Sequence, residues 1–252
     1  MSARSERDRV TVVGDESALA AAVAEFVVER SGAAIAERGR FDLALAGGST
    51  PKAAYALLAT PPLRSRVKWE LVRFFFGDER CVPPTDDRSN YKMANDALLG
   101  PLGIRESAVF RMRGEDEPAA AARAYAEILR RELSTGGTPV FDAIMLGMGP
   151  DGHTASLFPG NDPFEDDGSL VRAPYVEKFA AYRITLTPQV LNAARCVAIA
   201  TSGTPKAAAL AAVLEGPRDP RTYPIGVVAP VDGELTWFVD RAAAAQLRRI
   251  YA

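Results

Sequence analysis

The stretch DAIMLGMGPDGHTASLFPG, residues 142–160, decides both the fold class and the place to look for a functional site. It opens with DAIML, a short and almost wholly apolar run, and continues directly into a glycine-rich turn. That turn holds His153, the only histidine of the chain. Short apolar runs of this kind are typical of parallel strands that are buried on both faces. In open α/β sheets, ligands bind outside the carboxyl ends of such strands.

Further apolar runs alternate with alanine-rich helical segments along the chain. We expect strands at 10–13, 43–46, 71–76, 142–146, 183–186, 197–201, 227–229 and 235–239. We expect helices at 17–38, from Pro51, at 91–98, at 118–133, from Pro205 and at the C-terminus. The alternation predicts an α/β fold with a mainly parallel, doubly wound, Rossmann-like sheet and helices on both faces. Residues 159–174 are expected to form a surface loop, so 1–252 would be one domain.

The composition is that of a soluble globular protein, with 48% hydrophobic residues, 25% charged residues and a formal net charge of −2. This charge gives no reason to expect nucleic acid or a membrane as partner. No run approaches the length of a membrane span, and the start MSARSERDRV lacks the apolar core of a signal peptide. Cys81 and Cys196 offer neither a disulfide framework nor a metal-binding spacing. We therefore expect a cytoplasmic protein.

A glycine-rich loop, AGGST, follows the strand expected at 43–46. Gly48 permits close approach of the backbone, and Thr50 is predicted to cap a helix whose first residue is Pro51. The N–H groups and positive dipole end of such a helix suit a phosphate. An ordinary capped helix would have the same sequence, so the loop alone leaves both interpretations open.

The pentapeptide TPKAA occurs twice, at 50–54 and at 204–208, each time after an expected strand. Lys52 and Lys206 therefore hold equivalent positions in two strand–loop–helix units. A lysine this close to a helix start often points to solvent. The repeat alone does not decide whether either lysine binds a ligand.

Three charged residues, Asp78, Glu79 and Arg80, directly follow the strand expected at 71–76, and Asn90 opens the next helix. Two acids beside an arginine often form a surface ion-pair cluster. A position at the end of a parallel strand instead favours a ligand site.

The glycines of 147–152 form a GxGxxG pattern, which is a fingerprint of dinucleotide binding. That fingerprint belongs to a βαβ unit in which a long helix follows the glycines and an acid ends the second strand. Here the prolines and glycine of 159–163 interrupt any long helix. The pattern therefore favours a turn that presents Asp151 and His153.

Four blocks, GGSTP, GDER followed by SNY, GMGPDGHTASLFP and SGTPK, together resemble the 6-phosphogluconolactonase family and stand in its order. The resemblance extends from about Val10 to the C-terminal segment. It implies hydrolysis of 6-phospho-D-glucono-1,5-lactone to 6-phosphogluconate in the oxidative pentose phosphate pathway, without a metal or organic cofactor. The implied partner is a small sugar-phosphate lactone, and a monomer or weak homo-oligomer is expected.

Glucosamine-6-phosphate deaminase/isomerase has the same fold and shares the GST loop and the DGH turn. That family typically continues the turn with phenylalanine, asparagine and a glutamate that takes part in proton transfer. This chain continues with SLFP at 156–159, which favours the lactonase. A non-catalytic sugar-phosphate-binding module is the second alternative.

Three residues are expected to be catalytic, and the resemblance supports the position of Asp151 and the role of Arg80. His153 would be the general base that activates water, a task that suits an imidazole because its unperturbed pKa is about 6.5. Asp151 would orient the ring, and Arg80 would bind the carbonyl oxygen, where charge develops, or nearby hydroxyls. No metal ligand is expected.

The expected substrate-binding residues come from several blocks. Ser49 and Thr50, with their loop amides and Lys206, would hold the phosphate. Arg183 matches a family arginine near the phosphate, although a sheet-edge charge would look the same. Asn90 would contact sugar hydroxyls or hold its loop. The full set is Gly48, Ser49, Thr50, Asp78, Asn90, Gly152, Arg183 and Lys206.

Overall fold

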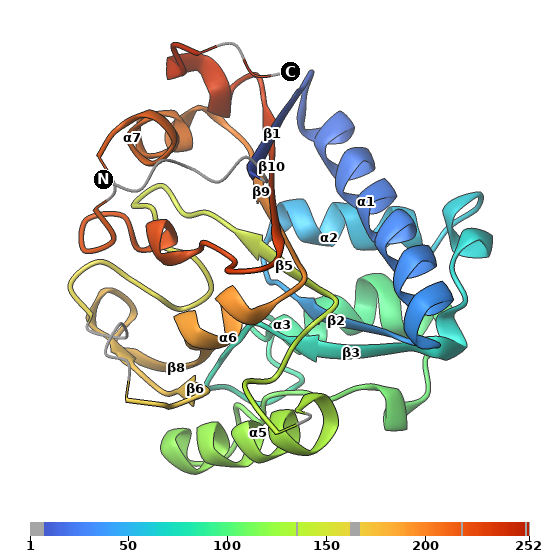
Figure 1. Ribbon diagram of the computed structural model, residues 1–252. Coiled ribbons are helices and arrows are strands. Elements are labelled where there is room, and N and C mark those ends of the chain that lie inside the picture. The colour runs from blue at the N-terminus through green and yellow to red at the C-terminus, as the bar shows by residue number, and fades with distance from the viewer. Residues whose placement is uncertain (1–7, 135, 162–166, 218, 250, 252) are drawn as a thin grey trace.

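The computed structural model describes residues 8–134, 136–161, 167–217, 219–249 and 251 and is centred on a parallel sheet (Figure 1). The sheet has six strands in the order β1-β10-β9-β5-β2-β3, and its neighbouring strands pair in parallel. Their bounds are β1 Asp8–Val13, β2 Phe41–Leu45, β3 Val72–Phe76, β5 Ala143–Gly147, β9 Cys196–Thr201 and β10 Glu234–Asp240.

Helices connect these strands, and Figure 1 shows α1 and α7 on opposite sides of the sheet. The α-helices are α1 Glu16–Arg38, α2 Ser49–Leu58, α3 Asn90–Ala94, α4 Gly100–Leu102, α5 Pro118–Leu133, α6 Pro188–Ala193 and α7 Ala207–Glu215. A π-helical turn, η3, spans Asn95–Leu99, and short 3-10 segments include η5 Glu177–Phe179, η6 Thr204–Lys206, η7 Pro224–Val227 and η8 Ala243–Gln246. The predicted α/β class with a mainly parallel sheet is confirmed.

A second, antiparallel sheet lies beside the carboxyl end of β3. It contains β4 Asp78–Arg80, β6 Val171–Arg172 and β8 Ala181–Leu186, and β7 Tyr175–Val176 also pairs with β8. The strand expected at 183–186 therefore lies outside the parallel sheet. Gly77 joins the two sheets, because its N–H donates to Leu45 of β2 and its carbonyl accepts from Leu186 of β8.

Two expected elements are wrong. Residues 227–229 form no strand, because the Asn192 side chain takes the backbone groups that a sheet ladder would use: its Nδ2 donates to the Val227 carbonyl and its Oδ1 accepts from the Ala229 N–H. The expected C-terminal helix is only the 3-10 turn η8. After it, the Glu215 carboxylate at the end of α7 accepts the backbone N–H groups of Arg248 and Arg249.

Segment 159–174, expected to be a surface loop, includes the short strand β6, and its residues 162–166 lie outside the described part of the chain. The single domain over 1–252 stays a prediction. None of the helices in the described part of the chain combines the length and apolar character that a membrane span needs.

Two buried tyrosines fix the carboxyl ends of β2 and β3. The Tyr55 hydroxyl donates to the Ala46 carbonyl and accepts from the Ala46 N–H, and Tyr125 does the same at Phe76. Both rings are fully buried, so these bonds form away from water, where an unpaired backbone group is costly. The loops that follow these strands therefore leave from fixed points.

Candidate active site

The loops at the carboxyl ends of the parallel strands enclose a cavity of about 260 Å³. This position is where an open α/β sheet is expected to bind a ligand. Eight predicted site residues line it: Gly48, Ser49, Thr50, Asp78, Arg80, Asn90, His153 and Lys206. Asp151, Gly152 and Arg183 are not among its lining residues.

His153 is paired with Asp151 at the edge of this cavity. The Nδ1 atom of the ring lies 2.5 Å from Asp151 Oδ1, and both side chains are about one quarter exposed. Burial raises the pKa of Asp151, but hydrogen bonds from His153 and Lys178 outweigh it and lower this pKa to about 2. Asp151 is therefore a carboxylate near neutral pH and can hold Nδ1 in its protonated form, which leaves Nε2 free to accept a proton.

Glycines make this arrangement possible. A Cβ on Gly149 would lie 2.0 Å from two atoms of the His153 ring, and Gly152 has a φ of +73° with Tyr223 packed against it. The Gly149 N–H donates to the His153 carbonyl, which closes the turn. The GxGxxG pattern is thus the turn that presents Asp151 and His153.

Two residues that the sequence did not single out complete the surroundings of the pair. Phe158 stacks on the His153 ring, with centroids 4.3 Å apart and planes inclined by 26°. Lys178 Nζ donates to Asp151 Oδ2 at 2.9 Å. Phe158 stands in the block after the histidine and could have been noticed there, whereas Lys178 lies 27 positions beyond Asp151 without a local signal.

Arg80 and Arg183 supply positive charge beside the cavity. They are paired Cα partners in the antiparallel β4–β8 ladder, and the Nε atom of each is buried without a hydrogen-bond partner among the residues that the structure describes. Burial, and then the charge of Arg80, lower the pKa of Arg183. The Arg183 guanidinium lies 4.8 Å from the centre of the Phe179 ring. Arg80 Nη1 donates to the Arg88 carbonyl. Within the described residues, neither arginine has a carboxylate oxygen within 4.0 Å, so no acid neutralises either charge.

Glu79, between the two predicted site residues of GDER, points inward. Its carboxylate accepts the N–H groups of Asn90 and Tyr91 and the Ser89 hydroxyl, so it caps the start of α3. Burial raises its pKa. The interpretation of this block as a surface ion-pair cluster is therefore wrong for Glu79.

Asn90 and Asp78 form a buried pair. Asn90 Nδ2 donates to both the carbonyl and Oδ1 of Asp78 at 2.9 Å, and Ser156 Oγ donates to Asp78 Oδ2 at 2.8 Å. Asn90 thus holds its loop, and its Oδ1 is left buried without a partner. A Cβ on Gly47 would lie 1.9 Å from that oxygen, so only glycine fits there.

The start of α2 differs from the prediction that Thr50 caps the helix and Pro51 is its first residue. The helix begins at Ser49 with Gly48 as N-cap, and no side chain caps it. Thr50 is inside the first turn, and its Oγ1 lies 3.0 Å from Ser202 Oγ, which joins the loop after β2 to the loop after β9. An uncapped N-terminus leaves the first N–H groups for an anion.

The repeated TPKAA segments diverge because their helical starts differ by one residue. The N-cap is Gly48 in the first copy and Gly203 in the second, so Lys52 is the fourth residue after its cap and Lys206 the third. Lys52 is exposed, whereas Lys206 is partly buried and lines the cavity, and this burial lowers its pKa. Only the second lysine therefore faces the cavity.

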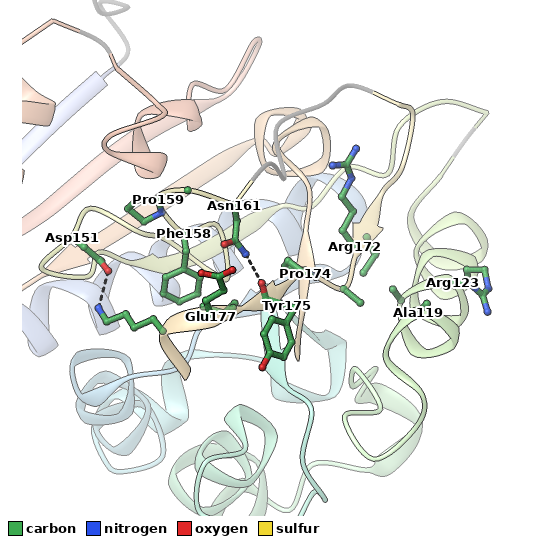
Figure 2. Close-up of a pocket in the computed structure, with 16 residues that line it drawn as sticks. Ala119, Arg123, Asp151, Phe158, Pro159, Asn161, Arg172, Pro174, Tyr175 and Glu177 are labelled. Carbon is green, nitrogen blue, oxygen red and sulfur yellow. Dashed lines mark hydrogen bonds and ion pairs between the residues drawn. The ribbon is translucent and has the colours of Figure 1, made fainter. Parts of the chain in front are cut away.

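A larger cavity of about 1010 Å³ lies beside Asp151 (Figure 2). Its walls come from α5, from 158–161 and from 171–178, and Asp151 and Lys178 are among its lining residues. His153 lines the smaller cavity and Asp151 the larger one, so the two cavities meet at this hydrogen-bonded pair.

No group of three or more His, Cys, Asp or Glu side chains in the described ranges is arranged to hold a metal ion. The chemistry available at the small cavity is that of one imidazole–carboxylate pair, several cations and an open helix start. This set suits proton transfer next to an anionic ligand.

Comparison with known proteins identifies the family. Residues 14–237 match the family described as glucosamine-6-phosphate isomerases/6-phosphogluconolactonase. The 6-phosphogluconolactonase of Treponema pallidum (strain Nichols) is 40% identical over 200 residues, covering 79% of this chain and 82% of that protein. The human 6-phosphogluconolactonase is 38% identical over 245 residues, covering 94% and 93%.

A solved structure of 6-phosphogluconolactonase from Trypanosoma brucei superposes with a TM-score of 0.84 at 30% sequence identity, covering 95% of this chain and 98% of that one. The match therefore extends over nearly the whole length of both chains. The chain belongs to the glucosamine-6-phosphate isomerase/6-phosphogluconolactonase family.

Proposed function

We propose that this protein is a 6-phosphogluconolactonase, which hydrolyses 6-phospho-D-glucono-1,5-lactone to 6-phosphogluconate in the oxidative pentose phosphate pathway. The observation that carries the proposal is the Asp151–His153 pair at a cavity whose cations, Arg80 and Lys206, have no carboxylate oxygen within 4.0 Å among the described residues. The names of the relatives and the extent of their similarity support the same activity.

His153 acts as the general base in this proposal. Its Nε2 takes a proton from water as the water oxygen bonds to the lactone carbonyl carbon, and Asp151 keeps Nδ1 protonated and stabilises the imidazolium. The imidazolium then returns the proton to the ring oxygen as the bond between that oxygen and the carbonyl carbon breaks. General-base catalysis of this kind contributes about 100- to 10,000-fold.

Arg80 stabilises the negative charge that develops on the carbonyl oxygen. A preorganised donor at such a position is worth on the order of 3 kcal/mol. Arg80 lines the small cavity, and its Nη1 donates to the Arg88 carbonyl, which holds the guanidinium in place.

Lys206 and the start of α2 bind the phosphate. Lys206 contributes a charge, and Ser49 and Thr50 contribute backbone and hydroxyl groups at an uncapped helix end. Arg183 extends this positive region from β8. Asn90 Oδ1, an acceptor without a partner, suits a sugar hydroxyl.

Deamination of glucosamine-6-phosphate is the alternative enzymatic function. It needs an acid after the DGH turn, but 156–158 are Ser, Leu and Phe, all buried, and Ser156 Oγ is occupied by Asp78. The absence of that acid favours the lactonase. The protein is further proposed to act in the cytoplasm as a monomer or weak homo-oligomer, with no nucleic acid or membrane partner.

The test is an assay of purified protein with freshly generated lactone, corrected for spontaneous hydrolysis. Hydrolysis above background in the presence of a chelator supports the proposal, and glucosamine-6-phosphate should release no ammonia. Ammonia release above a blank would favour the deaminase, and binding of the lactone without turnover would favour the binding module. Binding of a nicotinamide cofactor would revive the dinucleotide interpretation.

A further inference from the structure

The 3-10 segment η5 contacts the Asp151–His153 pair in two ways. Lys178 Nζ donates to Asp151 Oδ2, the oxygen that His153 does not use. Phe179 meets the edge of Phe158 with ring centroids 5.6 Å apart, and Phe158 stacks on His153. One segment therefore supports the imidazole both at its edge, through a carboxylate, and on its face, through a ring.

The segment η5 is the tip of a hairpin. β7 and β8 pair at Tyr175–Tyr182 and at Val176–Ala181, and Ala180 closes the turn with a φ of +46°. β8 then continues into the ladder with β4. Because paired strands hold both ends of the tip, Lys178 reaches Asp151 from a fixed scaffold.

We propose that Lys178 is a positioning residue for the general base, a role that rests on the proposed function. By holding Asp151 Oδ2, it keeps Oδ1 directed at Nδ1 of His153. Its positive charge also opposes the imidazolium and so tunes the base. Lys178 lines the larger cavity and not the one proposed for the substrate, so it acts through Asp151.

The charges around His153 come from four elements. Asp151 is on its own turn, Lys178 on η5, Asp78 and Arg80 on β4, and Lys206 on η6. Arg183, on β8, has its guanidinium over the Phe179 ring. Of the cations, Lys178 is the one that bonds to the partner carboxylate of His153. Its removal favours the imidazolium, so the fall of kcat on acidification should move to higher pH.

The kinetic test compares Lys178→Met with Lys178→Arg and with Lys68→Met, which removes an exposed lysine on the loop before β3. The Lys178 side chain is 56% exposed, so loss of the protein fold is not expected. Lys178→Met should lower kcat about two- to fivefold, the range that an exposed ion pair supports, with KM unchanged. The pH at which kcat falls to half on acidification should rise by about 0.3 to 0.8 of a pH unit. This is the shift expected from the loss of one water-screened charge at this distance. Lys178→Arg should restore both, and Lys68→Met should alter neither.

A second measurement is independent of activity. Since His153 is the only histidine, ¹⁵N-histidine NMR of protein purified without a histidine tag reports its titration without assignment. The midpoint should move up in Lys178→Met and stay in place in Lys178→Arg and Lys68→Met. A wild type without lactonase activity would refute the proposed function, while the NMR midpoints would still test the contact.

Unchanged kcat and an unchanged NMR midpoint in Lys178→Met would overturn the positioning role. Equal effects of Lys178→Met and Lys178→Arg would also overturn it, because they would show that the lysine stem matters and its charge does not. A rise in KM with constant kcat would instead make Lys178 a substrate contact.

Discussion

Arg80 and Arg183 face each other as direct partners across the β4–β8 ladder, and neither has a carboxylate within 4.0 Å in the described part of the chain. Like charges directly opposite each other destabilise an antiparallel pair. Two buried Nε atoms without acceptors add to that cost. The pair therefore stores repulsion that an anionic ligand would relieve.

The first prediction concerns this pair. Arg183→Met should stabilise the unliganded protein by up to about 1 kcal/mol, the scale of one cross-strand pair, and should raise KM for the phosphorylated lactone. Thermal unfolding in phosphate-free buffer and steady-state kinetics measure the two effects. Arg64→Met, at an exposed arginine, is the control and should change neither. Lower stability together with an unchanged KM would mean that Arg183 is a structural sheet-edge charge.

The second prediction concerns the base. His153→Asn should lower kcat about 100- to 10,000-fold with little change in KM, because the imidazole acts on water and not on ground-state substrate. The wild type should lose activity on acidification, since a protonated ring cannot accept a proton, and the variant should lack that limb. Circular dichroism must show a folded variant. If a folded variant keeps more than about a tenth of the wild-type kcat, His153 is not the base.

The third prediction uses the two copies of TPKAA as an internal control. Lys206→Ala should mainly raise KM for the phosphorylated lactone, because Lys206 lines the small cavity, whereas Lys52→Ala should not, because Lys52 is exposed. Unphosphorylated gluconolactone should be an equally poor substrate for wild type and Lys206→Ala. Equal KM values for Lys206→Ala and Lys52→Ala would remove Lys206 from the phosphate site.

The fourth prediction concerns the turn. Gly149→Ala places a methyl group 2.0 Å from the His153 ring, so the imidazole must move and kcat should fall in a protein that still folds. The matched control is Gly32→Ala in α1, where a Cβ meets nothing within 4 Å; it should keep kcat and unfold at an equal or higher temperature. Full activity of Gly149→Ala would show that the ring position is not critical.

The fifth prediction concerns acid. The folded-state pKa of Asp151 is lowered to about 2 from an ordinary value of 3.8, so its ionisation stabilises the fold above the ordinary value, and that contribution is lost as pH falls toward 2. Asp151→Asn should therefore lose less stability than wild type between pH 5 and about 2. Urea unfolding of both proteins across this range is the measurement. Parallel stability curves would show that the contact does not persist in solution.

Local patterns were enough to predict most strands and the histidine turn. β2 and β9 are buried along their whole length and β5 at every residue but its last, so the apolar runs report directly on their surroundings. Gly149 is needed because of contacts within the same turn, with Asp151 and His153. Such features depend on residues that are close in sequence, so they can be predicted from a short stretch of it.

Other features depend on distant partners and could not be predicted. Glu79 turned inward because α3 offers it backbone N–H groups, and Lys178 reaches Asp151 only because β7 and β8 form a hairpin. The strand expected at 227–229 does not form, because the Asn192 side chain hydrogen-bonds to the backbone of Val227 and Ala229. Residue type alone does not tell which of these partners the fold will supply.

The two oxygens of Asp151 face different neighbours, His153 toward the small cavity and Lys178 in the larger one. A small acid that occupied the larger cavity and drew Lys178 away would disturb the base while leaving the substrate site empty. Such an acid would lower kcat and leave KM unchanged. Because it would not compete with the lactone for one site, accumulating substrate could not displace it.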